Sequence, residues 1–470
     1  QEYGEALLKN KVGSVIALEP STGEVLAMVC SPTYDPNLLV GRIRTQNYGK
    51  LLLDPLKPLF DRALMAQYPP GSTFKPVMGL VGQQEGVLFP NSYYFCNGGY
   101  SIGSKIIKCE HVHGSIPLEP AISHSCNTYF CNVFRTVIDN RKYKSTEEAF
   151  EVWRKYMLSF GIGMRLGIDL PHALKGSMPT SAYYNKYFGK NHWKSSTIIS
   201  LGIGQGELGL NPLQLANVTA IIANRGFYYI PHVIKYIGND KHQYKKYVTR
   251  NYSNVDAKYF DVVVDGMENV VEAGTAAASK IRNISICGKT GTAQNPHGKP
   301  NSLFVGFAPR DNPKIAIAVI VENGGYGSLW AAPIASLMIE KYLTDSVSRP
   351  ELEQRMLTGN LMAYVKQALS GAPPMSSKTI LPEEAQKDKT VTKLTKDTSL
   401  RTASPKLTTP SSEKKIKEKP SATSTQKPKA KEIEKKSEAK PEGATANPQP
   451  EKEKPEHPET NEQEPKIKAN

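Results

Sequence analysis

The sequence predicts an α/β fold: one central antiparallel sheet, helices on both of its faces, and an added helical subdomain. Strand-like runs occur within residues 12–30 and again within residues 284–322, with helical periodicity between them. Strands at both ends of a region, separated by helices, fit one antiparallel sheet with helices on its faces. The sequence therefore predicts a folded domain at 1–345, and a tail of different composition follows it.

The C-terminal tail lacks the residues that build a core. Between Ser376 and Asn470 there is no Phe, Tyr or Trp, and Lys, Glu, Pro, Ser and Thr dominate. Such a segment cannot bury enough apolar surface to offset its chain entropy. We expect a disordered tail at 376–470, joined to the folded domain by a linker with a short helix at 346–375.

The net charge of +15 is spread over both parts of the chain. A basic surface suits polyanions, including anionic lipids and cell-wall polymers. No nucleic-acid recognition motif accompanies the charge, so we expect no nucleic-acid partner.

No run of eighteen apolar residues is present, so no membrane-spanning helix is predicted. The chain starts at Gln1 without a signal-like segment, and its first residues read as the end of a helix already under way. We expect a fragment of a longer protein.

The first part of the folded region predicts a hairpin and then a buried helix. Residues 12–19 and 24–30 are β-rich, and the turn signal at 20–23 between them indicates a hairpin. Residues 38–53 show no clear period and are expected to be irregular. The run after Ser72 is apolar nearly all round, which predicts a buried helix at the centre of the helical subdomain.

The later elements follow from periodicity and capping signals. Residues 91–115 are rich in Gly, Cys and His without a period, and 164–200 are expected to be loops. The expected helices cover 119–139, 146–160, 212–225, 259–272 and 332–343, and the expected strands cover 227–237, 284–294, 302–308 and 314–322.

A serine and a lysine three residues apart, Ser72 and Lys75, are the first candidate catalytic pair. On a helix, positions i and i+3 share a face, so the hydroxyl and the amine can meet. Pro69, Pro70 and Gly71 suit a turn that ends where a helix begins. A serine hydroxyl is a poor nucleophile without a base, and a desolvated lysine of lowered pKa can be that base. Alone, this spacing is common on solvated helix surfaces.

Two further motifs make the pair specific. Ser125–Asn127 has the form S-x-N, and Lys289–Thr292 has the form K-T-G followed by Thr. Each motif alone is more often a helix cap or a strand end. In this order, however, the three motifs are the signature of penicillin-binding proteins and class A β-lactamases.

The chain resembles class B penicillin-binding proteins from about Gly13 to about Leu343. The resemblance includes Gly204-Gln205-Gly206 and the run from Pro212 to Ala216. The opening at 13–37 is most similar to the elongation type, penicillin-binding protein 2. The resemblance implies the penicillin-binding-protein/serine β-lactamase-like transpeptidase fold and a peptidoglycan D,D-transpeptidase that β-lactams acylate.

The same resemblance implies a setting for the protein. A membrane anchor and a pedestal domain would precede Gln1. Through that missing region the protein would join a glycan polymerase and the elongation complex, at the periplasmic face of the inner membrane.

The resemblance also implies roles at the matching positions. Ser72 attacks the carbonyl of the penultimate D-Ala of a peptidoglycan stem peptide, and Lys75 accepts its proton. Ser125 relays a proton to the leaving amine, Asn127 holds Lys75 and the substrate amide, and Lys289 supplies positive charge for the substrate carboxylate.

Thr290, Gly291 and Thr292 would bind the substrate, with the two threonine hydroxyls on the carboxylate. The backbone N–H groups of Ser72 and Thr292 would form an oxyanion hole. No organic cofactor is implied.

A β-lactamase or a β-lactam-sensing protein is the alternative function. Glu207–Asn211 formally matches the E-x-x-L-N stretch that carries the deacylating Glu of class A β-lactamases. Here it follows Gly204-Gln205-Gly206 and runs into Pro212, which is the transpeptidase context, so we favour the transpeptidase.

A structural zinc site is predicted beside the catalytic motifs, with the ligands Cys96, Cys109, His113 and Cys126. Three thiolates and one imidazole make a closed tetrahedral set. The Gly-rich region between them has little core of its own, so a metal could fix its shape. Some elongation-type relatives carry zinc here with aspartates among the ligands, a set from which this chain departs.

Two alternatives to this ligand set stay open. A Cys96–Cys109 disulfide is plausible in an exported domain, and His111 could replace His113 as the fourth ligand. Cys30, Cys131 and Cys287 lie in apolar contexts and are expected to be buried free thiols.

Overall fold

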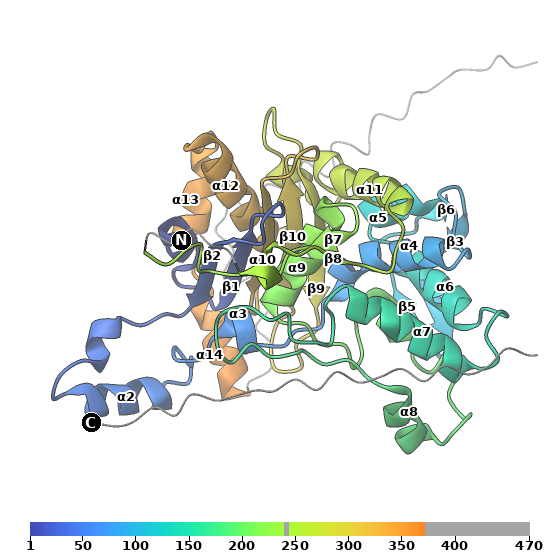
Figure 1. Cartoon of the computed structure of the whole chain (residues 1–470), viewed down its shortest axis with the longest axis horizontal. Helices are drawn as coiled ribbons and strands as arrows, with labels where there is room; N and C mark the ends of the chain where they lie inside the picture. Colours follow the sequence, from blue (N-terminus) through green and yellow to red (C-terminus); the bar gives the residue numbers. More distant parts are fainter. Residues whose placement is uncertain (239–243, 372–470) are drawn as a thin grey trace, which may run out of the picture. The chain divides into compact units, whose positions relative to one another are not determined.

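Five antiparallel strands form the central sheet, in the order β2–β1–β11–β10–β9 (Figure 1). The structure is a computed structural model that describes residues 1–238 and 244–371. The strands are β1 (Gly13–Leu18), β2 (Val25–Ser31), β9 (Cys287–Ala293), β10 (Asn301–Ala308) and β11 (Ile315–Val321). The prediction of one sheet built from both ends of the region is confirmed.

β1 joins the two ends of the region. It pairs with β2, with Val15 opposite Val29, in the hairpin that the sequence predicts. On its other side it pairs with β11, with Val15 opposite Val319. Every residue of β1, β10 and β11 is buried, so both faces of the sheet are covered by other elements.

Helices supply that cover. α9 (Pro212–Ala223) packs against β1, β10 and β11, and α12 (Ala331–Thr344) packs against β10 and β11 on the other face. α11 (Phe260–Glu272) runs beside the outermost strand, β9. All twelve residues of α9 are buried, which explains why its sequence is apolar all round instead of in one stripe.

The helical subdomain lies beside the sheet and contains α4, α5, α6 and α7 (Figure 1). Trp153 is fully buried in it, with the rings of Phe74, Phe134 and Phe150 at 6.3, 5.6 and 5.5 Å. The helices of this part are α4 (Lys75–Gln84), α5 (Leu118–Ser123), α6 (Asn127–Ile138), α7 (Thr146–Ser159) and α8 (Ser181–Phe188). Every residue of α4 except Gln84 is buried, as the sequence predicts.

The remaining described elements are short. The helices are α1 (Glu2–Leu8), α2 (Arg44–Leu53), α3 (Arg62–Met65), α10 (Lys245–Val248), α13 (Pro350–Thr358) and α14 (Met362–Ser370). The 3₁₀ turns are η1 (Pro36–Leu39), η2 (Gly71–Phe74), η3 (Ile199–Ile203), η4 (Ala257–Tyr259) and η5 (Ala277–Ser279). The small strands are β3 (Tyr94–Cys96), β4 (Gly99–Ile102), β5 (Lys105–Lys108), β6 (Gly114–Ile116), β7 (Phe227–Tyr228) and β8 (Asn251–Tyr252).

Several segments differ from the sequence expectation. Residues 38–53, which the sequence predicted to be irregular, form part of η1 and all of α2. No residue of α2 is buried, so its sequence shows no apolar stripe that would predict a helix. Residues 164–200 contain α8 as well as loops. Only two residues of 227–237 form a strand. The single helix expected at 119–139 is two helices, α5 and α6.

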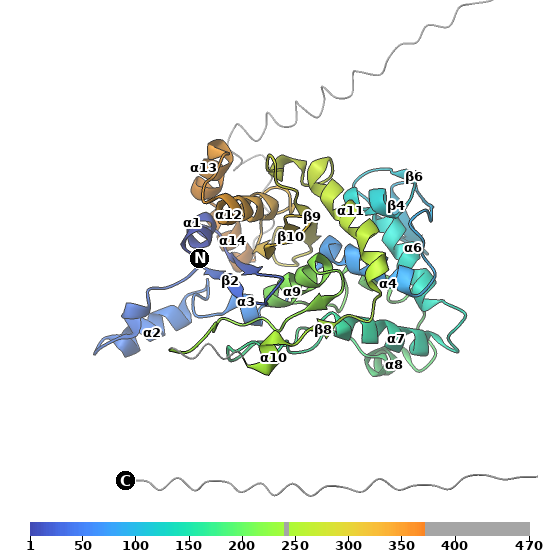
Figure 2. The same cartoon turned by 45° about the horizontal axis from the view of Figure 1, so that its top comes forward.

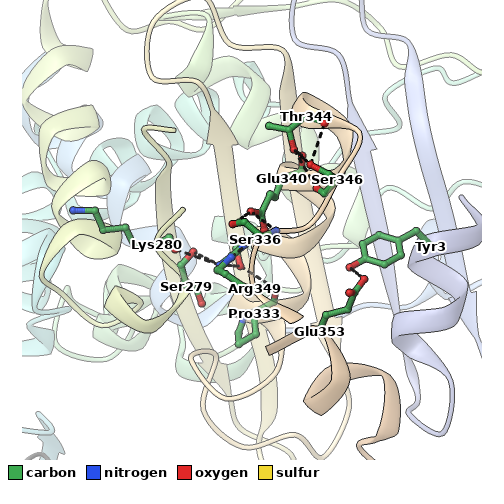
Figure 3. Close-up of polar contacts among 11 residues, drawn as sticks. Tyr3, Ser279, Lys280, Pro333, Ser336, Glu340, Thr344, Ser346, Arg349 and Glu353 are labelled. Carbon is green, nitrogen blue, oxygen red and sulfur yellow. Dashed lines mark hydrogen bonds and ion pairs between the residues drawn. The ribbon is translucent and has the colours of Figure 1, made fainter. Parts of the chain in front are cut away.

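Residues 346–371 form two packed helices where the sequence suggests a linker with a short helix. Met356 of α13 is fully buried, and its carbonyl accepts a hydrogen bond from Lys11 Nζ at 2.6 Å. Tyr3 Oη donates to Glu353 Oε1 at 2.7 Å (Figure 3). These contacts are between residues far apart in sequence, which the local composition of α13 does not reveal.

An ion pair anchors the start of α13 (Figure 3). Arg349 Nη2 lies 2.8 Å from Glu340 Oε2, and Arg349 Nη1 donates to the Ser279 carbonyl at 3.2 Å. Glu340 is only 2 % exposed. Burial raises the pKa of Glu340, but hydrogen bonds from Ser348 and Arg349 outweigh burial and bring the pKa below its ordinary value. The pair therefore holds α12, α13 and the segment before β9 together.

Within residues 1–238 and 244–371, no helix combines the length and the apolar character that a membrane crossing requires. The tail predicted at 376–470 lies outside the described residues.

Candidate active site

Ser72 lies in the 3₁₀ turn η2, which continues directly into α4 at Lys75. The turn begins at Gly71, whose φ of 55° is a left-handed conformation that favours glycine. Lys75 is fully buried, whereas Ser72 is half-buried. The sequence expectation of a helix start at Ser72 is therefore shifted by one turn, but the serine and the lysine stay in one continuous helical segment.

Two glycines let the Ser72 turn lie against β9. Gly71 N donates to the Gly204 carbonyl at 2.8 Å. A Cβ on Gly71 would meet the Thr292 carbonyl oxygen at 3.1 Å, and a Cβ on Gly204 would meet the Gly71 carbonyl oxygen at 2.3 Å. Residues 71, 204 and 292 thus form a close backbone packing that side chains would prevent.

Lys75 joins the first two motifs. Its Nζ donates to the Ser125 backbone carbonyl at 2.6 Å and to Ser125 Oγ at 3.0 Å. Burial lowers the pKa of Lys75 from 10.5 to about 8. A larger fraction of this amine is therefore neutral near neutral pH than for an exposed lysine, as a general base requires.

Ser125 reaches Lys75 because the chain breaks between α5 and α6. Ser125 has φ 57°, a left-handed conformation in a residue other than glycine. Cys126 then begins α6 as its N-cap, with Sγ accepting from Tyr129 N at 3.4 Å. The kink directs the Ser125 hydroxyl and carbonyl together at the lysine.

Asn127 does not make the contact that the sequence suggests. Its Nδ2 donates to the Lys108 carbonyl at 2.8 Å, and the hydrogen bonds of Lys75 Nζ go to Ser125. Asn127 thereby fastens the end of β5 to the start of α6. Its expected hold on Lys75 has no hydrogen bond to support it in the described structure.

The third motif occupies β9, and its lysine is fully buried. Burial, and then the charge of Lys75, lower the pKa of Lys289 well below its ordinary value. Lys289 Nζ donates to the Thr290 carbonyl at 3.3 Å, and Thr290 Oγ1 lies 2.6 Å from Thr275 Oγ1. Thr275 belongs to none of the three sequence motifs, so its contact with Thr290 could not be predicted from them. This contact orients the Thr290 hydroxyl.

The four candidate metal ligands converge. One ligand atom from each of Cys96, Cys109, His113 and Cys126 lies within 4.8 Å of all the others. Cys96 Sγ lies 3.3 Å from His113 Nδ1 and 3.6 Å from Cys109 Sγ. All three cysteines are free thiols, and His111 is not part of the cluster.

The electrostatics of the cluster favour a thiolate. A hydrogen bond from Cys126 is the main cause that lowers the pKa of Cys109, to about 4. Thr128 also donates to Cys109 Sγ, from its backbone N at 3.4 Å. A thiolate held by several donors is suited to a soft divalent cation.

A second polar cluster, which sequence reasoning missed, holds the chain just before Ser72. Tyr68 Oη donates to Glu322 Oε1 at 2.7 Å, and Arg62 Nε lies 3.1 Å from the same oxygen. Tyr68 and Arg62 are both buried. Tyr68 directly precedes the Pro69–Gly71 turn, but Glu322 is 254 residues away from it, so no local signal links the two.

A cavity of about 570 Å³ opens beside this cluster, with Arg62, Gln67, Tyr68, Asn295, Glu322 and Val365 among its lining residues. Ser72 does not line it. This cavity therefore lies next to the turn that carries Ser72, with Pro69 in its lining, and does not include Ser72.

The chain is similar to known proteins over most of its length. Residues 13–340 match the family described as the penicillin binding protein transpeptidase domain. The chain is 34% identical over 377 residues to the peptidoglycan D,D-transpeptidase MrdA of Haemophilus influenzae, which covers 75% of this chain and 56% of that protein. It is 31% identical over 351 residues to MrdA of Escherichia coli K12, covering 70% and 54%. The chain spans about half the length of the curated relatives it matches.

Solved structures are similar as well. Pseudomonas aeruginosa PBP2 in complex with WCK 5153 matches with a TM-score of 0.65 and 36% identity, over 73% of this chain and 77% of that one. Helicobacter pylori PBP2 matches with a TM-score of 0.64 and 26% identity, over 74% and 63%. A ceftriaxone acyl-enzyme of penicillin-binding protein A from M. tuberculosis matches with a TM-score of 0.61 and 26% identity, over 73% and 78%.

The contact between Gly204 and the Ser72 turn predicts a large loss of stability for Gly204→Ala. The new Cβ would lie 2.3 Å from the Gly71 carbonyl oxygen at a φ of 69°. We expect the free energy of unfolding to fall by about 3 kcal/mol, measured by urea denaturation.

Gly86→Ala is the matched control, because Gly86 has a φ of 70° and nothing within 4 Å of its added Cβ. We expect Gly86→Ala to lower the free energy of unfolding by only about 1 kcal/mol, the cost of a left-handed backbone conformation in a residue with a Cβ. Equal losses in the two variants would contradict the close packing at Gly204.

Proposed function

We propose, since this chain belongs to the family of penicillin-binding protein transpeptidase domains, that it is a peptidoglycan D,D-transpeptidase. It would cross-link stem peptides through a serine acyl-enzyme during cell-wall elongation, and β-lactams would acylate it. One observation carries the proposal: a buried lysine of lowered pKa follows Ser72 by one turn and hydrogen-bonds Ser125.

The acylation step uses the three motifs together. Ser72 Oγ forms a bond to the carbonyl carbon of the penultimate D-Ala while its proton passes to the neutral Lys75 amine. The tetrahedral oxyanion is stabilised by the backbone N–H groups of Ser72 and Thr292. When the C–N bond to the terminal D-Ala breaks, Lys75 returns the proton through Ser125 Oγ to the leaving amine.

The substrate carboxylate is held by β9. Thr290 and Thr292 offer hydroxyl donors beside Gly291, and Lys289 lies buried behind them. A carboxylate that arrives there favours the charged form of Lys289, opposing the effect of burial on the lysine pKa. The acyl-enzyme then transfers to the acceptor amine of a second stem peptide, which restores Ser72.

Relatives indicate partners and place of action. One similar structure is a complex of Helicobacter pylori PBP2 with MreC, and another is described as a peptidoglycan synthase complex. We propose that this chain likewise works with a glycan polymerase in an elongation complex, at the periplasmic face of the inner membrane.

The alternative, a β-lactamase or a β-lactam-sensing protein, has less support. Glu207 accepts a hydrogen bond from Tyr184 Oη at 2.9 Å. Asn211 is the N-cap of α9 and forms a capping box with Gln214. Both residues of the E-x-x-L-N match therefore have structural partners, which favours a long-lived acyl-enzyme.

We also propose that Cys96, Cys109, His113 and Cys126 hold a structural zinc ion. The donor set fits, because three sulfur atoms and an imidazole nitrogen converge and one thiolate is favoured. Bound zinc would link these four side chains and so stabilise the fold, and it would take no part in catalysis. Since Cys126 lies between Ser125 and Asn127, the ion would hold the S-x-N motif from behind.

The proposed acyl-enzyme gives the first test. Intact-mass spectrometry after treatment with benzylpenicillin should show one adduct that persists for many minutes, and Ser72→Ala should show none. An adduct that survives Ser72→Ala, or turnover within seconds, would reject the transpeptidase.

The lowered pKa of Lys75 provides the second test of the proposed function. Only the neutral amine accepts the serine proton, so the second-order rate constant of penicillin acylation should rise about tenfold per pH unit below pH 8 and level off above it. Stopped-flow measurement with a fluorescent penicillin gives this profile. A rate that keeps rising to pH 10 would exclude Lys75 as the base.

The proposed zinc site provides the third test. Metal analysis of protein purified without chelator should find one zinc per chain, His113→Ala should lose it, and the matched variant His111→Ala should keep it. A metal-free protein with a Cys96–Cys109 disulfide by peptide mapping and full penicillin labelling would refute the site.

A further inference from the structure

α8 lies at the edge of the helical subdomain (Figures 1 and 2), and three of its aromatic side chains are exposed. Tyr183, Phe188 and Tyr187 are 38%, 47% and 64% exposed. The rings of Tyr183 and Tyr187 lie 4.6 Å apart at an angle of 48°. Exposed apolar side chains that lie together point to an interaction site, whereas exposed side chains scattered singly do not.

The base beneath these rings is firmly packed. Tyr184 is 1% exposed, with the rings of Trp193 and Phe150 at 5.2 and 5.4 Å. Trp193 Nε1 donates to Asn185 Oδ1 at 2.8 Å, and Thr180 Oγ1 caps the helix by accepting from Tyr183 N at 3.1 Å. The exposed rings therefore stand on a fixed helix instead of a loose loop.

The surroundings of the rings are basic. Three lysines and a histidine are exposed on α8 and the loop after it: Lys186, Lys190, His192 and Lys194. The carboxylates near the helix have partners within the fold. Glu147 accepts from Asn185, Glu151 from Ser181 N, and Glu207 from Tyr184 Oη. The surface thus offers aromatic faces and positive charge to an incoming ligand.

A short loop connects this surface to the candidate active site. Glu207, which binds Tyr184 on α8, follows Gln205 by two residues. Gln205 Nε2 reaches the Thr292 carbonyl on β9 at 3.5 Å, and the neighbouring Gly204 packs on Gly71. Hence α8 lies one loop away from the motifs that act on the stem peptide.

We propose that α8 and the loop at 189–194 bind the glycan strand of peptidoglycan. We name this surface the α8 platform. The proposal rests on the proposed function, because the peptide delivered to Ser72 is attached to such a strand. Sugar rings present C–H faces that pack on the negative face of an aromatic ring. The carboxylates of neighbouring stem peptides match the lysines and add a salt-sensitive attraction.

Binding of the full chain to purified peptidoglycan sacculi, and to a soluble chitin tetrasaccharide, tests the platform. Co-sedimentation measures the first and isothermal titration calorimetry the second. We expect Tyr187→Ala to weaken both affinities about fivefold, the ratio that one lost aromatic contact implies. Lys190→Gln should weaken sacculus binding and leave the uncharged tetrasaccharide unaffected.

Tyr252→Ala is the matched control, since Tyr252 is also 64% exposed but lies on β8. It should bind both probes as the parent does. Equal binding by Tyr187→Ala and Tyr252→Ala would overturn the platform, as would tighter binding of a single-stranded oligonucleotide than of glycan.

Penicillin labelling keeps this test apart from the test of the proposed function. Every platform variant should label at Ser72 at the parent rate, because none of the changed side chains belongs to the catalytic motifs. A parent chain that fails to label would reject the transpeptidase. A normally labelled Tyr187→Ala chain with undiminished glycan binding would reject the platform alone.

Discussion

The rest of the structure depends on the burial of one amine, Lys75 Nζ. A lysine can be fully buried only where its donors are satisfied and its proton can be given up. Both hydrogen-bond acceptors, the carbonyl and the hydroxyl of Ser125, come from one residue. Placing that residue requires the break between α5 and α6, and holding α4 against it requires the aromatic core around Trp153. The helical subdomain thus buries the Lys75 amine and supplies both of its hydrogen-bond acceptors.

The elements around this amine support one another from both sides. On one side, the close packing of Gly71 and Gly204 brings the Ser72 turn to β9. On the other, Asn127 and the Cys96–Cys109–His113–Cys126 cluster fix the start of α6. The S-x-N motif therefore takes its position from a small polar region with short strands, whereas the K-T-G motif lies in the main sheet and the Ser72 turn packs between that sheet and the helical subdomain. The three motifs are therefore positioned by contacts between residues that are close in space but far apart in sequence.

Much of the fold and of the candidate site could be predicted from the sequence, and each exception has a physical cause. The hairpin, the strands at 284–322 and the buried helix after Ser72 have strong periodicity, and the order of the three motifs indicated the candidate catalytic residues. α2 and α8 were missed because they bury too little to show a stripe. The packing of α13 was missed because it depends on Lys11 and Tyr3, more than 300 residues away. The partner of Asn127 was misjudged because a motif specifies residue types and not which hydrogen bond each one makes.

The position of β9 at the end of the strand order has a consequence for how a peptide is read. One side of β9 pairs with β10, and no further strand of the described residues pairs with its other side. Under the proposed function, a stem peptide would pair with this edge as an extended strand and be recognised through its own backbone at one fixed alignment. Main-chain pairing tolerates variation in side chains but not in chirality or length, because either change moves the carbonyl out of register. Under the proposed function, pairing with the sheet edge would therefore determine which peptide bond reaches Ser72.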